Sequence, residues 1–321
     1  MYKSGFRALF VAACLFSSPA VAKPRYVTLN MGGSQTFLTS INTGGEIVGF
    51  SGSNSFVREP DGTITSFTLD NYALWPTSIN DSGYIAGFGY HSDNQIGFLR
   101  DPAGTITTFA PSGATMTQAT AMNVSLTITG LTAGADHVQH GFVRASDGTI
   151  TTFDPVDSTQ TAPLAINDSG TIVGRYSTAT MERGFIRDSS GTITTFDVPG
   201  ATNTQPKSIN AAGWITGLFR DASGQHGFLR SPDGAFTTFG SVHARLDPRC
   251  INNAGVVTGV SRNSHGFIRK ADGSIKLFKI EGDKIHETNP TCLNDDGVVI
   301  GSYFQVMGHG FGTQIGFIRF P

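Results

Sequence analysis

The chain has 321 residues, of which 14% are charged and 40 are glycine, and its formal net charge is −2. An average soluble domain has about 25% charged residues and about 7% glycine, so this chain is poor in charge and rich in turn-forming residues. Because lysine and arginine are not in excess, little is available to neutralise a phosphate backbone. The composition therefore excludes nucleic acid as an expected partner.

The chain begins with the organisation of a secretory signal peptide. Lys3 and Arg7 precede the short apolar run 8–16, and the Ala-x-Ala segment 20–22 follows it. This order is typical of a cleaved leader, and the apolar run is too short to cross a bilayer. We expect cleavage after Ala22 and export to the periplasm or the extracellular space, with no membrane span.

A lipoprotein signal is the alternative for this leader. Cys14 would then be the lipidated residue, but the apolar run continues past it to Phe16, which fits a lipobox badly. We expect residues 1–22 to be a signal peptide and residues 23–321 to be the mature chain, which we take as a monomer.

Residues 23–321 repeat one phrase. Its clearest copy, within residues 191–230, reads GTITTF, then SIN, GWITG and GFLR. The asparagine recurs every 38 to 44 residues, at Asn42, Asn80, Asn123, Asn167, Asn210, Asn252 and Asn294. A period of about 40–45 residues with several short strands is typical of a propeller blade. The sequence therefore predicts an all-β chain in one domain, a seven-bladed β-propeller.

Loop lengths predict the order of strands within a repeat. In the fourth copy, 165–167 and 171–174 are separated by a tight turn with glycine, and so are 185–187 and 192–196. The link 153–164 is longer and carries two prolines, which do not suit a central strand. Each blade should have four antiparallel strands, with the SIN strand innermost and the TTF strand outermost.

The two ends of the repeat array complement each other. The last copy stops at 316–319 with no TTF strand after it, whereas residues 26–29 match that missing strand. We expect the N-terminal strand to complete the last blade and close the ring, which leaves no exposed edge.

Several repeated residues are interpreted as scaffold. An arginine stands two places after each repeated phenylalanine. Its apolar side-chain stem should be packed, and its guanidinium should hydrogen-bond to a nearby carbonyl or carboxylate. The repeated asparagines should bond turn amides. Leu126 replaces the turn glycine of the other copies, so the turn of the third copy is expected to differ. The seven arginines are Arg58, Arg100, Arg144, Arg187, Arg230, Arg269 and Arg319.

Two cysteines remain in the mature chain, at equivalent positions of neighbouring repeats. Cys250 and Cys292 each stand immediately before the apolar residue of the IN or LN motif. An oxidising compartment permits a disulfide between them if their Cα atoms lie within about 7 Å. Two small buried residues are the other reading, because the remaining copies hold serine or alanine there.

Antiparallel alternation puts both tight turns of every blade on one face and the long crossovers and variable loops on the opposite face, here called the long-loop face. Loops on a rigid scaffold are where binding residues gather. The aromatic and basic side chains there suit a glycan or a protein surface. The expected binding residues are Tyr72, Trp75, Tyr90, His91, Arg183, His226, Arg245, Arg249, Arg262, Tyr303 and His309.

The sequence supports catalysis or metal binding less well than it supports binding of a glycan or a protein. His140, His226 and His265 share one position in three copies, but in a ring they would lie apart, so we expect no metal site and no cofactor. If the protein were an enzyme, the first residues to test would be His137, His140, Arg175, Tyr176 and Arg220.

Residues 141–174 and 184–230 resemble the HAF repeats of bacterial extracellular proteins. The shared pattern is seen in His226-Gly227-Phe228, in Asp197-Val198-Pro199-Gly200-Ala201 and in Ile166-Asn167-Asp168-Ser169-Gly170. The resemblance covers nearly the whole mature chain. It implies export and a propeller-like fold, and it brings no catalytic residues with it.

Two functions follow from these observations. The first is a secreted binding module that recognises a surface glycan or a protein through the long-loop face. The second is a carbohydrate-active enzyme, either a glycoside hydrolase with two facing carboxylates or a polysaccharide lyase with a base near an arginine. We expect the binding module rather than the enzyme, because no nucleophile or metal motif stands out.

Overall fold

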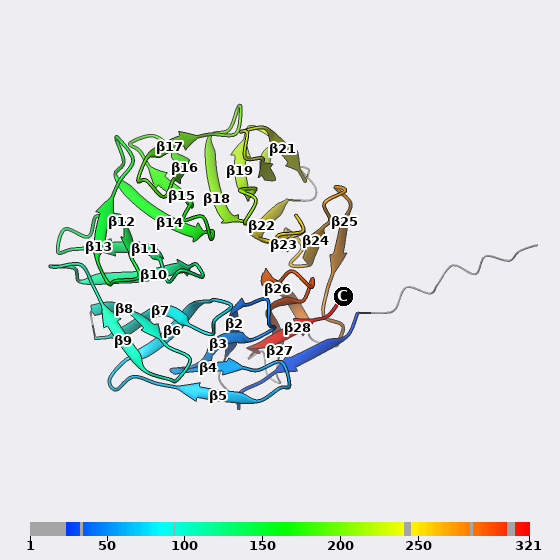
Figure 1. Cartoon of the computed structure of the whole chain (residues 1–321). Helices are drawn as coiled ribbons and strands as arrows, with labels where there is room; N and C mark the ends of the chain where they lie inside the picture. The colour runs from blue at the N-terminus through cyan, green and yellow to red at the C-terminus, as the bar shows by residue number, and fades with distance from the viewer. Residues whose placement is uncertain (1–23, 33–34, 93, 241–244, 283–284, 307–311) are drawn as a thin grey trace, which may run out of the picture.

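The computed structural model describes residues 24–32, 35–92, 94–240, 245–282, 285–306 and 312–321. The signal-peptide prediction therefore lies outside the described residues. All regular elements of the described chain are β-strands, arranged around a centre (Figure 1). Within this part of the chain no helix is long and apolar enough to cross a membrane.

Each repeat contributes four strands in chain order. The first, innermost strands are β2 (Thr36–Ile41), β6 (Ala73–Ile79), β10 (Met116–Met122), β14 (Gln160–Ile166), β18 (Asn203–Ile209), β22 (Leu246–Ile251) and β26 (Ile285–Leu293). The second strands are β3 (Ile47–Ser51), β7 (Ile85–His91), β11 (Ile128–Ala133), β15 (Ile172–Ser177), β19 (Ile215–Asp221), β23 (Val257–Ser261) and β27 (Val299–Val306).

The third and fourth strands lie further from the centre. The third strands are β4 (Asn54–Arg58), β8 (Asn94–Arg100), β12 (Gln139–Arg144), β16 (Glu182–Arg187), β20 (Gly224–Arg230), β24 (Gly266–Arg269) and β28 (Gly312–Arg319). The outer strands are β5 (Ile64–Phe67), β9 (Ile106–Phe109), β13 (Ile150–Phe153), β17 (Ile193–Phe196), β21 (Phe236–Phe239), β25 (Ile275–Phe278) and β1 (Tyr26–Leu29).

The strands form six hydrogen-bonded sheets. Five have four antiparallel strands, and one has eight because β10 meets β8 through a single parallel pair, Met116 with Gln95. The sheet count is thus one below the seven blades expected. The N-terminal strand β1 pairs antiparallel with β28, as the sequence predicted, with Val27 opposite Ile318.

Repeated aromatic and arginine side chains form the seams between neighbouring repeats. Each phenylalanine of a third strand is at most 1% exposed, and six of them meet the outer-strand phenylalanine of the preceding repeat at centroid distances of 5.8–6.4 Å. On six of those outer rings lies the guanidinium of the Phe-x-Arg arginine, 5.0–5.2 Å from the centroid. In Arg187 the same group donates to the carbonyl of Asp188, at 3.3 Å. The scaffold interpretation of these arginines is confirmed.

Glycine in the second strands permits a close approach to the inner strand. A Cβ at Gly174 would stand 2.3 Å from the carbonyl oxygen of Ala162, so no larger residue fits without moving the backbone. This contact explains why an IVG-like segment follows every first turn.

The seven repeated asparagines form a cycle of hydrogen bonds. Each side chain is 5–6% exposed, accepts the backbone N–H four residues on at 2.9–3.0 Å, and donates to the backbone carbonyl of the next repeat's asparagine at 3.0–3.4 Å. The bond from Asn294 to Asn42 returns to the first repeat. The asparagines therefore bond turn amides, as expected, and also join repeat to repeat.

The expectation of a different turn in the third copy was wrong. Leu126 has φ 61°, close to the 73–84° of the six glycines at this position, and its N–H donates to the Asn123 carbonyl at 3.1 Å. A left-handed conformation costs a non-glycine residue roughly 1–2 kcal/mol. The Leu126 side chain packs against a cluster containing Phe109 and Ile128, which offsets this cost.

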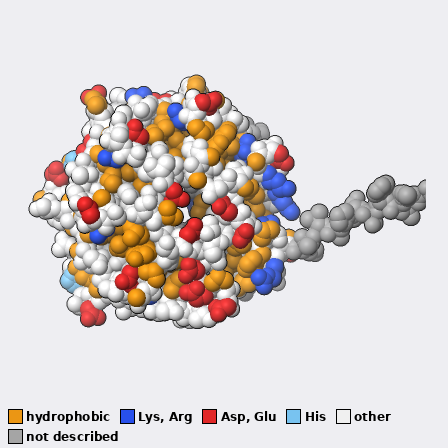
Figure 2. Space-filling view, viewed as in Figure 1, with side chains coloured by type: hydrophobic (Ala, Val, Ile, Leu, Met, Phe, Trp, Pro, Cys, Tyr) orange, Lys and Arg blue, Asp and Glu red, His pale blue; other side chains and the backbone are white. Residues whose placement is uncertain are grey.

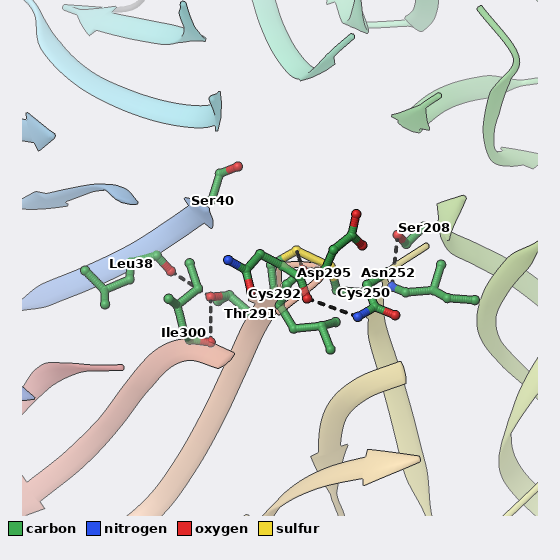
Figure 3. The surroundings of a disulfide bond; sticks show 12 residues. Leu38, Ser40, Ser208, Cys250, Asn252, Thr291, Cys292, Asp295 and Ile300 are labelled. Carbon is green, nitrogen blue, oxygen red and sulfur yellow. Dashed lines mark hydrogen bonds between the residues drawn. A yellow bond between two sulfur atoms is a disulfide. The ribbon is translucent and has the colours of Figure 1, made fainter. Parts of the chain in front are cut away.

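Cys250 and Cys292 form a disulfide, with their Cα atoms 5.0 Å apart. Figure 3 shows the bridge joining β22 to β26, with Ser208 and Ser40 at the equivalent positions of the flanking repeats. The bridge links two neighbouring inner strands. Of the two alternatives that the sequence left open, the structure shows the disulfide.

Asn167→Ala should destabilise the protein by about 1–3 kcal/mol, because the partly buried Thr171 N–H loses its acceptor and the Asn210 carbonyl loses a donor. Urea unfolding measures the change. Thr194→Ala, on the exposed face of β17, is the control and should change stability by about 0.5 kcal/mol or less. Equal effects of the two substitutions would contradict a role for the asparagine cycle.

Reduction of the disulfide should lower the free energy of unfolding by about 2–4 kcal/mol, because the bridge closes a loop of 42 residues in the unfolded chain. Denaturant melts with and without a reducing agent measure this. A Cys250→Ala/Cys292→Ala double variant should melt identically in both conditions. A wild-type protein that is indifferent to reductant would show that the two thiols are unbridged in solution.

Candidate functional site

The axis of the molecule has two chemically different ends. At the tight-turn end, a cavity of ≈ 290 Å³ is lined by the asparagine cycle and by the residues that follow it, among them Asp81, Asp168 and Asp295. In Figure 2 acidic side chains gather around the central hollow. These carboxylates already accept backbone N–H groups, for instance that of Thr43 at 2.9 Å. They are therefore used by the scaffold.

No metal centre forms at this acidic end. Among the residues that the structure describes, no group of three or more His, Cys, Asp or Glu side chains is placed to hold a metal ion. His140, His226 and His265 lie on or beside β12, β20 and β24, in three different sheets.

The long-loop half of the inner strands carries aromatic side chains on one side of the axis. Trp75 on β6 meets Phe88 at 5.1 Å, Tyr90 at 6.1 Å and Phe50 of the preceding repeat at 6.1 Å, and Phe50 stacks on Phe37 at 5.2 Å. All five rings are partly accessible, and Tyr90 is 40% exposed. We call these five residues the aromatic arc. Partly exposed rings held by one another form a rigid apolar platform.

Charged side chains gather in the fourth to sixth repeats, two of them at positions that correspond to the aromatic arc: Arg175 to Phe88 and Asp247 to Trp75. The charged arc comprises Arg175, Glu182, Lys207, Asp247 and Arg249. Arg175 forms an ion pair with Glu182 across β15 and β16, and Arg249 lies 3.6 Å from the Asp247 carboxylate. The aromatic arc and the charged arc stand on different repeats around the same axis, on strands that Figure 1 shows. Lys207 and Arg249 lie just past the middle of β18 and β22, counted from the long-loop end.

Glu182 is the most tightly held group of the charged arc. Burial alone would raise its pKa, but hydrogen bonds from Asn203 and Gln205 and the positive charge of Arg175 outweigh burial and lower it. Both amides come from β18 of the next repeat, at 2.6 and 2.5 Å. Glu182 is therefore ionised at neutral pH and joins the fourth repeat to the fifth.

Lys207 differs from the other members of the charged arc. Burial lowers the pKa of its ammonium and outweighs the opposing effect of Asp247, while the positive charges of Arg175 and Arg249 lower it further. No hydrogen bond or ion pair to this amine comes from the described part of the chain. The amine is thus partly buried and has no close partner among those residues.

The sequence-predicted residues divide between these arcs and other places. Trp75 and Tyr90 belong to the aromatic arc, and Arg175 and Arg249 to the charged arc. Tyr72 and His91 stack on each other beside the aromatic arc, 5.4 Å apart. Trp75, Arg175 and Tyr176 were expected in loops but lie within strands β6 and β15.

Other candidates are paired within the scaffold. His140 bonds Asp154 at 2.6 Å, and Arg183 occupies the equivalent position of the next repeat and bonds Asp197 at 2.7 Å. Tyr176 is 3% exposed and faces Arg183 across the strands. Each of these two pairs connects the third strand of its repeat to the segment that follows the outer strand.

The remaining candidates are spread over several repeats. His137 lies on an exposed turn with φ 58°, Arg220 contacts Gln225, and His226 contacts Ser223 and Asp221. Arg245 and Arg262 are exposed. Tyr303 is 5% exposed in a hydrophobic cluster with Phe278 and Phe317, and so is not on the surface. His309 lies outside the described residues. The five proposed catalytic residues therefore belong to three different sheets.

Six residues of the two arcs were not expected from the sequence. They all lie in strands, whereas loops were expected to carry the binding residues: Phe37, Phe50, Phe88, Glu182, Lys207 and Asp247. A signal was present, because aligned inner strands hold threonine or leucine at the Lys207 position in five of the seven repeats and lysine or arginine in the other two.

Glu182→Gln should lower the free energy of unfolding at neutral pH by about 1–2 kcal/mol, and with it the melting temperature, because Arg175 loses its partner. The folded pKa of Glu182 is below its ordinary value of 4.5, so this contribution is complete above about pH 4.5 and disappears as pH falls through the folded value. Melts across acidic pH test this.

Glu59→Gln provides the control for that experiment. Burial and the nearby Glu46 and Asp61 raise the pKa of Glu59, so removing its charge should not destabilise the protein at neutral pH. A Glu182→Gln deficit that persists unchanged to the lowest pH would contradict the ion-pair account.

Comparisons with known proteins identify the fold. No protein-family model and no curated protein sequence matches the chain. Among solved structures, a streptogramin B lyase is similar over 93% of this chain and 98% of its own, with 13% identity and a TM-score of 0.63.

An inactive variant of virginiamycin B lyase from Staphylococcus aureus with quinupristin is similar over 93% and 100%, at 14% identity and a TM-score of 0.61. TolB from Acinetobacter baumannii is similar over 71% and 60%, at 13% identity and a TM-score of 0.53. At such identities only the fold is shared: this chain is an all-β protein of the propeller type.

Proposed function

We propose that this protein is an exported seven-bladed β-propeller that binds a surface glycan through its long-loop face. The blade count rests on seven four-stranded repeats, two of which meet in the eight-stranded sheet through one residue pair. The cycle of seven asparagines supports a closed ring. Export rests on the leader-like residues 1–22 and on the resemblance to HAF repeats.

The aromatic arc on the long-loop half of the axis is the observation that carries the glycan proposal. Sugars present apolar faces that stack on aromatic rings and hydroxyls that need polar partners. The aromatic arc supplies the first requirement and the charged arc the second. The tight-turn end offers neither, because its polar groups bond the scaffold.

A protein partner would use the long-loop face differently. Protein interfaces favour a central apolar patch with a polar rim, whereas here the polar groups stand across the axis from the aromatic rings. We therefore propose a polymer of sugars as the ligand of a monomeric protein, and a protein ligand becomes an outcome of the experiment below.

A lyase is the second candidate function, favoured by Lys207. Elimination from an acidic sugar needs a base close to a cation that neutralises the carboxylate. Lys207, whose pKa is lowered, would be the base, and Arg175 or Arg249 would be the cation. Release of unsaturated products from polyuronates, measured by ultraviolet absorbance, tests for this activity. Hydrolysis has less support, because both carboxylates of the charged arc are paired with arginine.

Tyr90→Ala should weaken binding of the protein to immobilised glycans about threefold to tenfold, because the exposed ring of the aromatic arc is lost. A glycan array followed by titration of the best ligand measures this. Trp214→Ala is the matched control, since Trp214 is similarly exposed, at 39%, but follows the first tight turn of its repeat.

The outcomes of the glycan experiment are distinct. Loss of binding in the Tyr90 variant alone supports the long-loop face. Loss in the Trp214 variant alone would move the site to the tight-turn face. Binding only to a protein in the same format would overturn the glycan proposal.

A further inference from the structure

Lys207 breaks a pattern that four of the other six inner strands follow. It is the extra residue of a β-bulge in β18, between Pro206 and Ser208 in the pairing with β19. In four other repeats the side chain at this bulge donates to a backbone carbonyl of the next repeat. These bonds are Thr77 to Ala119, Thr120 to Pro163, Arg249 to Pro290 and Thr291 to Leu38, at 2.8–3.3 Å.

Lys207 is held in place without such a bond. Its side chain is partly buried, and the charges acting on it come from Asp247 and Arg249 on β22 and from Arg175 and Glu182 on β15 and β16. Three cations and two carboxylates leave one positive charge in excess. Glu182 is fully engaged by Arg175, Asn203 and Gln205, so it does not neutralise the lysine.

Two unpaired acceptors lie in the same region. Oδ1 of Asp247 and Oδ1 of Asn203 are buried and have no hydrogen-bond partner among the described residues. A buried acceptor without a donor is costly, so a ligand hydroxyl gains affinity if a turn of either side chain brings its oxygen within reach. The site is therefore complementary to a ligand with an anionic group at Lys207 and hydroxyl donors beside it.

We propose that Lys207, with Arg175 and Arg249, binds the carboxylate of a hexuronic acid residue, while Asp247 and Asn203 accept hydrogen bonds from hydroxyls of the same sugar. This inference rests on the proposed glycan-binding function and names its ligand class. The aromatic arc then stacks on the neighbouring sugars of the chain.

Acidic sugar fits better than an inorganic anion. Sulfate carries no hydroxyl donor, the phosphate dianion carries a single one, and both would face the negative charge of Asp247, whereas a uronic acid offers one carboxylate together with several hydroxyls. A neutral sugar supplies the hydroxyls but leaves Lys207 without an anion. The combination of charges therefore selects the carboxylated sugar.

The experiment compares oligogalacturonate with its methyl-esterified form, which has the same shape and no charge. Calorimetry on the mature wild-type protein should show the acid binding about tenfold more tightly than the ester, as a charge-assisted hydrogen bond implies. Lys207→Gln should reduce the affinity for the acid to that for the ester and leave the ester unchanged. Lys276→Gln, on the outer strand β25, is the control and should keep the preference.

Two results would overturn the proposal. One is an acid preference that survives in Lys207→Gln, and the other is an equal affinity of sulfate for the wild-type site. If Lys207→Gln does not fold, Lys207→Arg should keep the acid preference, and added salt should erase it in the wild type; absence of a salt effect would count against the ion pair.

Failure of the proposed glycan-binding function can be distinguished from failure of the uronate assignment. If neither the acid nor the ester binds, and an array of other glycans gives no Tyr90-dependent binding, then the long-loop face is not a glycan site. If the ester and the acid bind equally and Tyr90→Ala weakens both, the glycan function stands and only the uronate assignment is wrong.

Discussion

The hydrogen-bond cycle of the repeated asparagines is the constraint on which the rest of the molecule depends. Each buried amide fixes its own turn through a backbone N–H and the neighbouring repeat through a backbone carbonyl. Because every asparagine serves two repeats, the angle between neighbouring sheets is set locally and identically around the axis. The seams of phenylalanine and arginine further out then fill the space that this angle creates.

The same constraint decides which end of the axis is free for function. At the tight-turn end, the asparagines and the carboxylates after them are used in scaffold bonds. Toward the long-loop end the inner strands differ from repeat to repeat, with Trp75 in the second and Asp247 at the same position of the sixth. A scaffold that is regular at one end can therefore carry an asymmetric set of side chains at the other, and the two ends differ in charge.

Much of the candidate site was visible in sequence only as residue types. Tyr90, Trp75 and Arg249 were expected on the long-loop face, and the structure places them in two arcs around the axis. Their neighbours Phe50, Phe88 and Asp247 lie in strands, whereas the binding residues were expected on loops. Tyr303 illustrates the opposite case, since a residue expected in an exposed loop extends β27 and is buried.

The sequence by itself determined the four-stranded antiparallel unit, the strand order and the pairing of the N-terminal strand with the last repeat. These follow from period, turn residues and loop lengths, which are local properties of the chain. Tertiary structure alone decided the disulfide, the turn at Leu126, which packing holds in a glycine-like conformation, and the meeting of Arg175, Lys207 and Asp247. Each of these depends on contacts between separate repeats, and no local pattern in the chain encodes a distance from one repeat to another.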